Sequence, residues 1–262
     1  MHCWGAEVAD LDDILANRRW LRRTMPFPHI VAREVFRDTF YTALANQLTA
    51  VVERRTEAGS RPPLRPIPGY DAYGGGFDRE QEGPLGLFQT TAWRDLLSGL
   101  FGITPTPYVF AGTHYHAIGS RNGFIHNDCN PVWFPAAAGL SIQTPNYAMC
   151  DYKTGAGTAP GAEKVQVVRG VAMIFYLLND GWQSGDGGET GLYDSADADI
   201  DCPIVRCPPI NNTLIAFECT PRSFHSFISN RRIPRISIIM WAHRPKQEAL
   251  EGFGADGLEQ WK

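Results

Sequence analysis

Two histidines and one carboxylate in the sequence have the types and spacing of a metal site. His126 and Asp128 are separated by one residue, and His225 follows the apolar run of residues 214–217. Residues i and i+2 of a strand point to the same face, so His126 and Asp128 are expected to project side by side. Two imidazoles and one carboxylate on one face of an ion leave three coordination positions open. This is the geometry of non-haem Fe(II) oxygenases.

A second motif, Arg235-x-Ser237, begins ten residues after His225 and again places two polar residues at i and i+2. A guanidinium group binds carboxylates bidentately, so this pair suits the far carboxylate of a dicarboxylic acid. His-x-Asp alone is a weak signal, because a polar strand residue followed by a capping acid is common. The ordered set, with Trp241 six residues beyond Arg235, is much more specific.

Other polar residues near these motifs are also candidates for the site, and each has an ordinary structural role as its alternative. His114 and His116 are expected to face the same side of a strand, where lining or surface histidines are common. For His116, contact with a co-substrate or substrate is the alternative. His243 lies at a strand end, and a structural role is favoured. Cys129 directly follows Asp128, so alternation turns it away from the metal, as a buried inert thiol.

Helices are expected in the first hundred residues and strands in the remainder. Apolar residues every three or four positions predict helices over residues 33–57 and 87–101, the second ending at Gly102. Residues 62–76 are expected to form a loop. Alternating or β-branched segments predict strands over residues 107–117, 165–178, 213–219, 225–229 and 235–243, with a short extended piece at 123–128. An insertion at about residues 132–163 is a candidate lid.

These elements predict one domain that is mainly β with N-terminal helices. Residues 1–104 form its mainly helical part, and residues 105–245 form a small antiparallel barrel or double sheet.

Composition excludes several classes of protein. The 262 residues are 44% hydrophobic and 20% charged, which argues against disorder. The net charge of −4 argues against a nucleic-acid partner. Six scattered cysteines without a Cys-x-x-Cys pair argue against a disulfide framework or zinc ribbon. No segment has the pattern of a signal peptide or membrane helix, so we expect a cytoplasmic protein that makes no membrane contact.

The combined motifs resemble the prolyl 4-hydroxylase-like branch of the Fe(II)/2-oxoglutarate-dependent oxygenases. The resemblance extends over residues 107–243 and includes Phe-Tyr-Leu-Leu-Asn at 175–179 and Gly-Gly-Glu-Thr at 187–190. It implies a double-stranded β-helix (jelly-roll) core and the use of Fe(II), 2-oxoglutarate and O2. By resemblance, His126, Asp128 and His225 are the iron ligands and Arg235 binds the distal carboxylate of 2-oxoglutarate.

The chain departs from this branch at two positions. A tyrosine about ten residues before the first ligand is replaced by His116, and the tyrosine that often assists the arginine corresponds to Leu177. Ser237 is expected to supply the missing hydroxyl, and His116 is expected to contact the co-substrate. Family members that halogenate have a small residue in place of Asp128, so the resemblance implies hydroxylation.

The expected reaction is hydroxylation of an unactivated C–H bond of a small molecule, an amino acid or a natural-product intermediate, with succinate and CO2 as co-products. Three alternatives remain open. One is a prolyl hydroxylase that acts on a peptide or protein. Another is a cupin-like metal enzyme without 2-oxoglutarate, which would give Arg235 and Ser237 no role. The third is an inactive binding module, although such modules usually lose a metal ligand and this chain retains all three.

Overall fold

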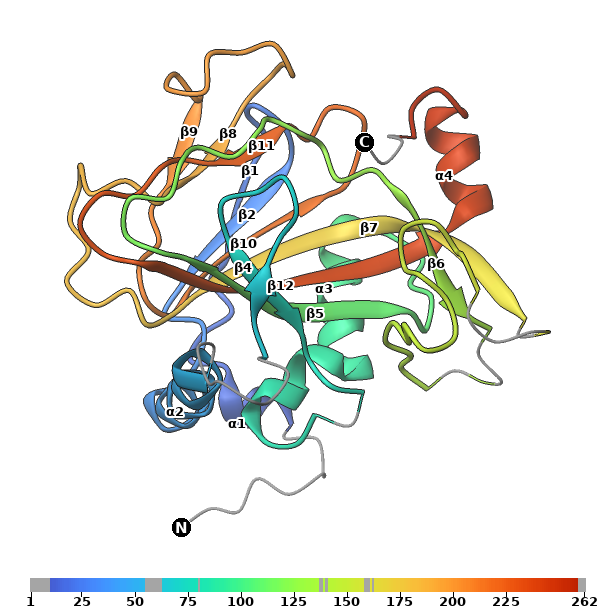
Figure 1. Cartoon of the computed structure of the whole chain (residues 1–262), viewed down its shortest axis with the longest axis horizontal. Coiled ribbons are helices and arrows are strands. Elements are labelled where there is room, and N and C mark those ends of the chain that lie inside the picture. The colour runs from blue at the N-terminus through green and yellow to red at the C-terminus, as the bar shows by residue number, and fades with distance from the viewer. Residues whose placement is uncertain are drawn as a thin grey trace.

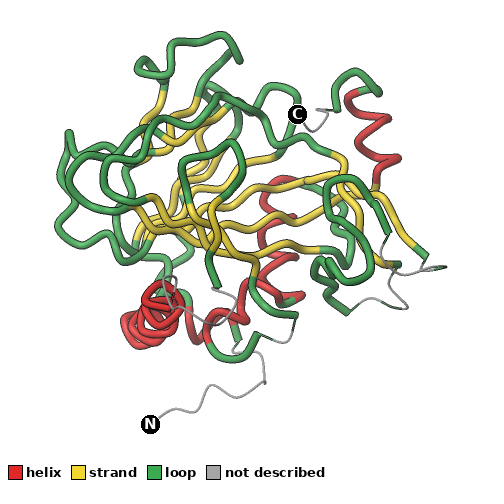
Figure 2. Tube along the Cα trace, viewed as in Figure 1, coloured by secondary structure: helices red, strands yellow, loops and turns green. Residues whose placement is uncertain are grey.

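The computed structural model describes residues 10–54, 63–79, 81–136, 139, 141–157, 161 and 163–258. In Figure 1, α1, α2 and α3 lie on one side of a large sheet and β8, β9 and β11 on the other, and Figure 2 shows strands at the centre of the molecule. The elements, in chain order, are α1 (Leu11–Ile14), β1 (Leu21–Arg23), β2 (His29–Arg33), α2 (Asp38–Glu53), β3 (Arg65–Pro66), β4 (Tyr73–Gly76), η2 (Pro84–Gln89), α3 (Thr91–Phe101), β5 (Val109–His116), β6 (Pro131–Pro135), β7 (Lys164–Tyr176), β8 (Thr190–Leu192), β9 (Val205–Cys207), β10 (Thr213–Glu218), β11 (His225–Phe227), β12 (Arg235–Pro245) and α4 (Lys246–Phe253).

The strands form two antiparallel sheets. The large sheet has the order β1-β2-β10-β7-β12-β5-β4-β3, with β6 paired to β7, and the small sheet has the order β11-β8-β9. Bridges between His126 and His225 and between Gly187 and Asn230 extend the small sheet. This arrangement fits a jelly-roll core, and the predicted fold class is confirmed.

Alternation along β12 separates an apolar face from a polar face. Ile236, Ile238 and Met240 belong to the main hydrophobic core, which also contains the buried apolar residues of α2, η2 and α3. Arg235, Ser237 and Trp241 occupy the intervening positions and therefore face the other side of the sheet, toward the small sheet. The packing of β12 against the helices thus determines which residues line the space between the two sheets.

The first predicted helix begins later than expected. Arg33 belongs to β2, and α2 begins at Asp38. The predicted apolar stripe is present, because Phe40, Leu44 and Leu48 are fully buried. Phe36 is buried in the same core from outside the helix, so the apolar spacing extends beyond the helix itself. The expected end at residue 57 lies outside the described residues. The second predicted helix is divided into η2 and α3, and Gly102 ends it with φ +69°.

Several short strands were not predicted. The strands β1 to β4 lie within the part of the chain expected to be mainly helical, and all four join the large sheet. The strand β6 lies in the expected insertion, where Pro135 pairs with Lys164, so the irregular segment starts at residue 136. Strands of two to five residues carry too few positions for a clear alternation. No helix in the described ranges is long and apolar enough to cross a membrane.

A bulge in β7 reverses the direction of its side chains. Ala242 of β12 pairs with Val171, whereas His243 pairs with Arg169, so Gly170 is an extra residue in β7. Paired residues share a face, so Val171 joins the main core while Arg169 points into the space between the sheets. Gly170 fits closely, because an added Cβ would lie 3.3 Å from Ala242 O and 3.3 Å from Arg244 N.

We expect Gly170→Val to lower the free energy of unfolding by about 1–3 kcal/mol, because the new side chain meets backbone atoms that cannot move aside. Gly99→Ala is the matched control. An added Cβ at Gly99 in α3 has no neighbour within 4 Å, so this change should stabilise the protein by about 0.5–1 kcal/mol. Urea unfolding followed by circular dichroism measures both. A Gly170→Val protein as stable as wild type would contradict the assignment of a tight bulge.

Candidate metal centre

The structure brings together the three residues predicted to bind iron. One ligand atom from each of His126, Asp128 and His225 lies within 4.8 Å of the others. His225 opens β11, and residue 126 lies beside it through reciprocal backbone hydrogen bonds of 3.1 Å and 2.8 Å. The two imidazole rings are 4.3 Å apart between centroids. Asp128 has φ +56°, a left-handed conformation that Asp tolerates better than most residues.

Both histidines have a defined tautomer that suits a metal. Nδ1 of His126 lies 2.9 Å from Phe124 O, and Nδ1 of His225 lies 3.0 Å from Ser223 O. A carbonyl oxygen can only accept, so each Nδ1 carries the proton and each Nε2 presents a lone pair. The Nε2 atoms lie 3.8 Å (His126) and 3.5 Å (His225) from the Asp128 carboxylate oxygens. Burial, followed by the neighbouring His225, lowers the pKa of His126 to about 4 and keeps its ring neutral. This donor set fits a divalent transition metal.

The carboxylate of Asp128 is oriented by two side chains from the large sheet. Arg169 of β7 donates a hydrogen bond to Oδ1, and Trp241 of β12 donates to Oδ2 over 2.9 Å. The guanidinium group of Arg169 lies 3.7 Å from the Trp241 ring centroid, which adds a cation–π contact. Burial alone would raise the pKa of Asp128, but Arg169 and the two neighbouring histidines together outweigh it and hold the pKa well below its usual range.

Arg169 is held in turn by a chain of hydrogen bonds. Its Nε donates to the Tyr152 hydroxyl over 3.4 Å, and this hydroxyl lies 2.9 Å from Nε2 of His243. Nδ1 of His243 donates to Tyr108 O over 2.9 Å, so its Nε2 accepts the Tyr152 proton. His243 therefore has a structural partner on each nitrogen and lies behind the metal site.

The buried cation Arg235 lies on the same face of the large sheet as Trp241. Arg235 is 3% exposed, donates to Ser237 Oγ over 2.9 Å and donates to Thr190 Oγ1 over 3.2 Å. Its Nε has no hydrogen-bond partner, and no carboxylate of the described residues lies within 4.0 Å of it. A buried charge without a counter-charge is costly, so this site fits an anionic ligand.

His116 is placed beside this cation, as the cross-strand partner of Arg235. It is fully buried, and its ring stacks on Phe227 with centroids 3.7 Å apart. Nδ1 lies 3.2 Å from Asp71 O, whereas Nε2 has no partner among the described residues. The position agrees with a residue of the co-substrate site, and its contact with the co-substrate stays a prediction.

Sequence reasoning missed three residues around the cation and the carboxylate. The guanidinium carbon of Arg235 lies 5.1 Å from the ring centroid of Tyr176, and the Tyr176 hydroxyl is 2.5 Å from Thr190 Oγ1. Leu177, the position assigned from the resemblance, is instead buried in the main core. Strand phase would have found Tyr176, because it pairs with Ser237. Arg169 was hidden by the bulge. Tyr70 comes from a loop, and its ring lies 5.3 Å from that of His116.

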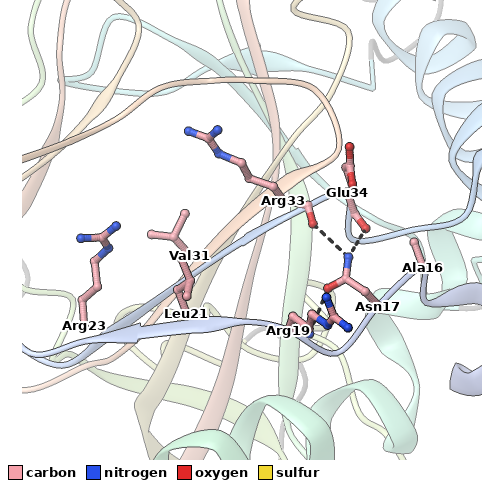
Figure 3. Close-up of a pocket in the computed structure, with 8 residues that line it drawn as sticks. All are labelled: Ala16, Asn17, Arg19, Leu21, Arg23, Val31, Arg33 and Glu34. Atoms are coloured by element: carbon pink, nitrogen blue, oxygen red, sulfur yellow. Dashed lines mark hydrogen bonds between the residues drawn. The ribbon is translucent and has the colours of Figure 1, made fainter.

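A basic pocket lies elsewhere on the molecule, at the β1 edge of the large sheet. Its volume is about 810 Å³, and Figure 3 shows Asn17 bonded to the backbone of its neighbours there. The lining residues are Ala16, Asn17, Arg19, Leu21, Arg23, Val31, Arg33 and Glu34. None of the candidate metal ligands belongs to it, so this pocket is separate from the metal centre.

Residues 148–243 match the family model of the 2OG-Fe(II) oxygenase superfamily. The matched segment includes Arg169, His225 and Arg235. It begins after His126 and Asp128, which the fold places beside His225. A search of curated proteins finds no match.

Solved structures with a similar fold include several prolyl hydroxylases. A prolyl hydroxylase from Trichoplax adhaerens, in complex with a hypoxia inducible factor peptide fragment, is 16% identical with a TM-score of 0.53, covering 85% of this chain and 86% of its own. Prolyl 4-hydroxylase from Phytophthora capsici is 18% identical with a TM-score of 0.52, covering 86% and 61%. The viral collagen prolyl hydroxylase of Paramecium Bursaria Chlorella virus-1, with 2-oxoglutarate, is 12% identical with a TM-score of 0.50, covering 83% and 96%.

At these identities the likeness concerns the fold, and the family model adds the sequence signal. The match and the fold agree with the presence of a His-Asp-His cluster that could hold a metal ion. Residues 148–243 thus match the 2OG-Fe(II) oxygenase superfamily, whose enzymes use Fe(II), 2-oxoglutarate and O2, and the fold of the chain is similar to that of solved prolyl hydroxylases.

Proposed function

We propose that His126, Asp128 and His225 bind Fe(II), and that Arg235 and Ser237 bind the distal carboxylate of 2-oxoglutarate. One observation carries this proposal. One ligand atom from each of the two imidazoles and the carboxylate lies within 4.8 Å of the others. The face of the large sheet beside them carries a buried arginine without a carboxylate partner among the described residues. A cupin-like enzyme that does not use 2-oxoglutarate would leave that arginine without a ligand.

The bound metal and co-substrate supply the oxidising chemistry, by which a C–H bond, 2-oxoglutarate and O2 become an alcohol, succinate and CO2. The chain itself orients the ligands. The carbonyl groups of Phe124 and Ser223 hold the two imidazoles in the tautomer that binds a metal. Arg169 and Trp241 fix the plane of the Asp128 carboxylate. Because this carboxylate would itself be an iron ligand, it would leave no place for a halide there, and hydroxylation is the proposed outcome.

The proposed substrate is a small molecule, an amino acid or a natural-product intermediate. Residues of the long segment between β6 and β7 support this choice. Tyr152 is 4% exposed and contacts Arg169, and the Trp133 ring packs so closely on Gly155 that an added Cβ would lie 2.7 Å from it. At Tyr152 this segment therefore lies behind Arg169, and we expect it to limit the space available beside the metal centre, which favours a compact substrate.

A prolyl residue in a peptide is the second candidate substrate. The observation that favours it is the fold itself, which is shared with prolyl hydroxylases, one of which was solved with a bound peptide fragment. The two candidates differ in the size of the molecule that must reach the metal, and turnover distinguishes them.

We expect Arg169→Met to destabilise the metal-free protein by about 3–5 kcal/mol, because it leaves the buried Asp128 carboxylate without its cation. Arg232→Met is the control. Arg232 also pairs with an aspartate, Asp186 at 3.5 Å, but its side chain is 69% exposed, and such pairs contribute little. Urea unfolding of the two variants measures the difference, and equal stability would show that Arg169 does not compensate the charge of Asp128.

We expect free amino acids to stimulate succinate formation and to yield a product heavier by one oxygen atom, with prolyl peptides showing no such effect. Mass spectrometry of Fe(II)-loaded protein incubated with each class measures this. The His225→Ala protein, tested in parallel, should be inactive toward both classes. Turnover of peptides alone would contradict the small-molecule proposal while leaving the iron site in place.

A further inference from the structure

His114 differs from the other described histidines because its ring forms no hydrogen bond with the described residues. The remaining five, His29, His116, His126, His225 and His243, each have a backbone carbonyl within 3.2 Å of Nδ1. The His114 side chain is half-buried, whereas its neighbours Thr113 and His116 are at most 1% exposed. Its two ring nitrogens thus form no hydrogen bond with the described residues, and the residue is partly exposed.

The register of the sheet places His114 at the co-substrate anchor. Its cross-strand partner in β12 is Ser237, as Arg235 is the partner of His116. Directly paired side chains lie about 5 Å apart at Cβ on one face of a sheet, so these four residues form the corners of one patch. On the other side, Gly74 of β4 leaves room for the ring, because an added Cβ would lie 3.3 Å from His114 Cδ2.

His116 cannot provide a hydrogen bond to a carboxylate in its present tautomer. Its Nδ1 proton is committed to Asp71 O, so Nε2 carries only a lone pair. Burial, then the charge of Arg235, keeps the pKa of His116 well below its usual value, and the ring remains neutral. A carboxylate oxygen needs a donor, which leaves this role on β5 to the other histidine.

The surroundings of His114 favour an anionic ligand. Burial, then the Arg235 cation, lowers the pKa of His114 to about 3, and the charges of Asp128, Arg169 and His126 also act on it. The ring is therefore neutral, with one donor and one acceptor. Tyr70 packs beside it, with ring centroids 6.2 Å apart, and limits its orientation.

We propose that His114, rather than His116, donates a hydrogen bond from β5 to a carboxylate oxygen of 2-oxoglutarate. The inference rests on the proposed function and adds a binding residue to the same site. Since either nitrogen of His114 can carry the proton, the free ring can adopt the tautomer that the ligand requires. A hydrogen bond to a charged carboxylate is stronger than one between neutral groups, so removing this donor should measurably lower the affinity for 2-oxoglutarate.

The test is calorimetric titration of 2-oxoglutarate into anaerobic, Fe(II)-loaded protein. His114→Phe keeps a ring but removes the donor, and we expect the dissociation constant to rise about ten- to one-hundred-fold. His114→Asn retains a donor and should show a smaller loss. Thr113→Val, next along β5, removes a buried hydroxyl that has no partner and should leave the affinity unchanged. Iron content and circular dichroism establish that each variant folds and holds metal.

The outcomes separate this inference from the proposed function. If wild type binds no 2-oxoglutarate, or if Arg235→Ala binds it as wild type does, the proposed function fails. If wild type binds and Arg235→Ala does not, but His114→Phe and His114→Asn both retain full affinity, the inference is overturned. A His116→Phe protein that loses affinity while His114→Phe retains it would likewise overturn the inference and assign the donor to His116.

Discussion

The register of β12 against β5 and β7 is the constraint on which the rest of this structure depends. Because Ile238 packs among the helices, its neighbours Arg235, Ser237 and Trp241 must face the opposite side. The same pairing sets His116 and His114 beside Arg235 and Ser237, and Tyr176 beside Ser237. A shift of one residue would exchange the core and the site, so the apolar packing stabilises the fold and positions the chemistry together.

The two buried arginines that face the space between the sheets, Arg169 and Arg235, have different electrostatic environments. Arg169 is neutralised within the chain by Asp128 and held by Tyr152 and Trp241. Arg235 contacts hydroxyl groups and aromatic rings but no carboxylate of the described residues. The first arginine therefore stabilises the Asp128 carboxylate, and the second leaves a positive charge without a carboxylate partner among the described residues. This asymmetry is the electrostatic basis of the proposed binding of a dicarboxylic acid beside a divalent metal.

Simple alternation predicted much of the site, and it failed where the backbone is irregular. The pairs His126 and Asp128 and Arg235 and Ser237 do lie together as expected, although residue 126 forms only an isolated bridge and Asp128 is left-handed rather than extended. Arg169 could not be found, because the bulge at Gly170 reverses the phase inside a continuous apolar strand. Tyr70 could not be found either, since its place depends on a loop that packs from outside the strand. Strands as short as β3 carry no periodic signal, which explains why the first hundred residues were expected to be mainly helical.

The measurement that tests the central claim most directly is an anaerobic titration of the Fe(II)-loaded protein with 2-oxoglutarate, monitored by visible absorption. Chelation of the iron by the keto acid should produce a saturable charge-transfer band, and the Arg235→Ala protein should require much more 2-oxoglutarate to reach it. Protein that holds iron but shows no band at any 2-oxoglutarate concentration would contradict the account and favour a metal enzyme with another co-substrate. Failure to bind Fe(II) at all would favour an inactive binding module.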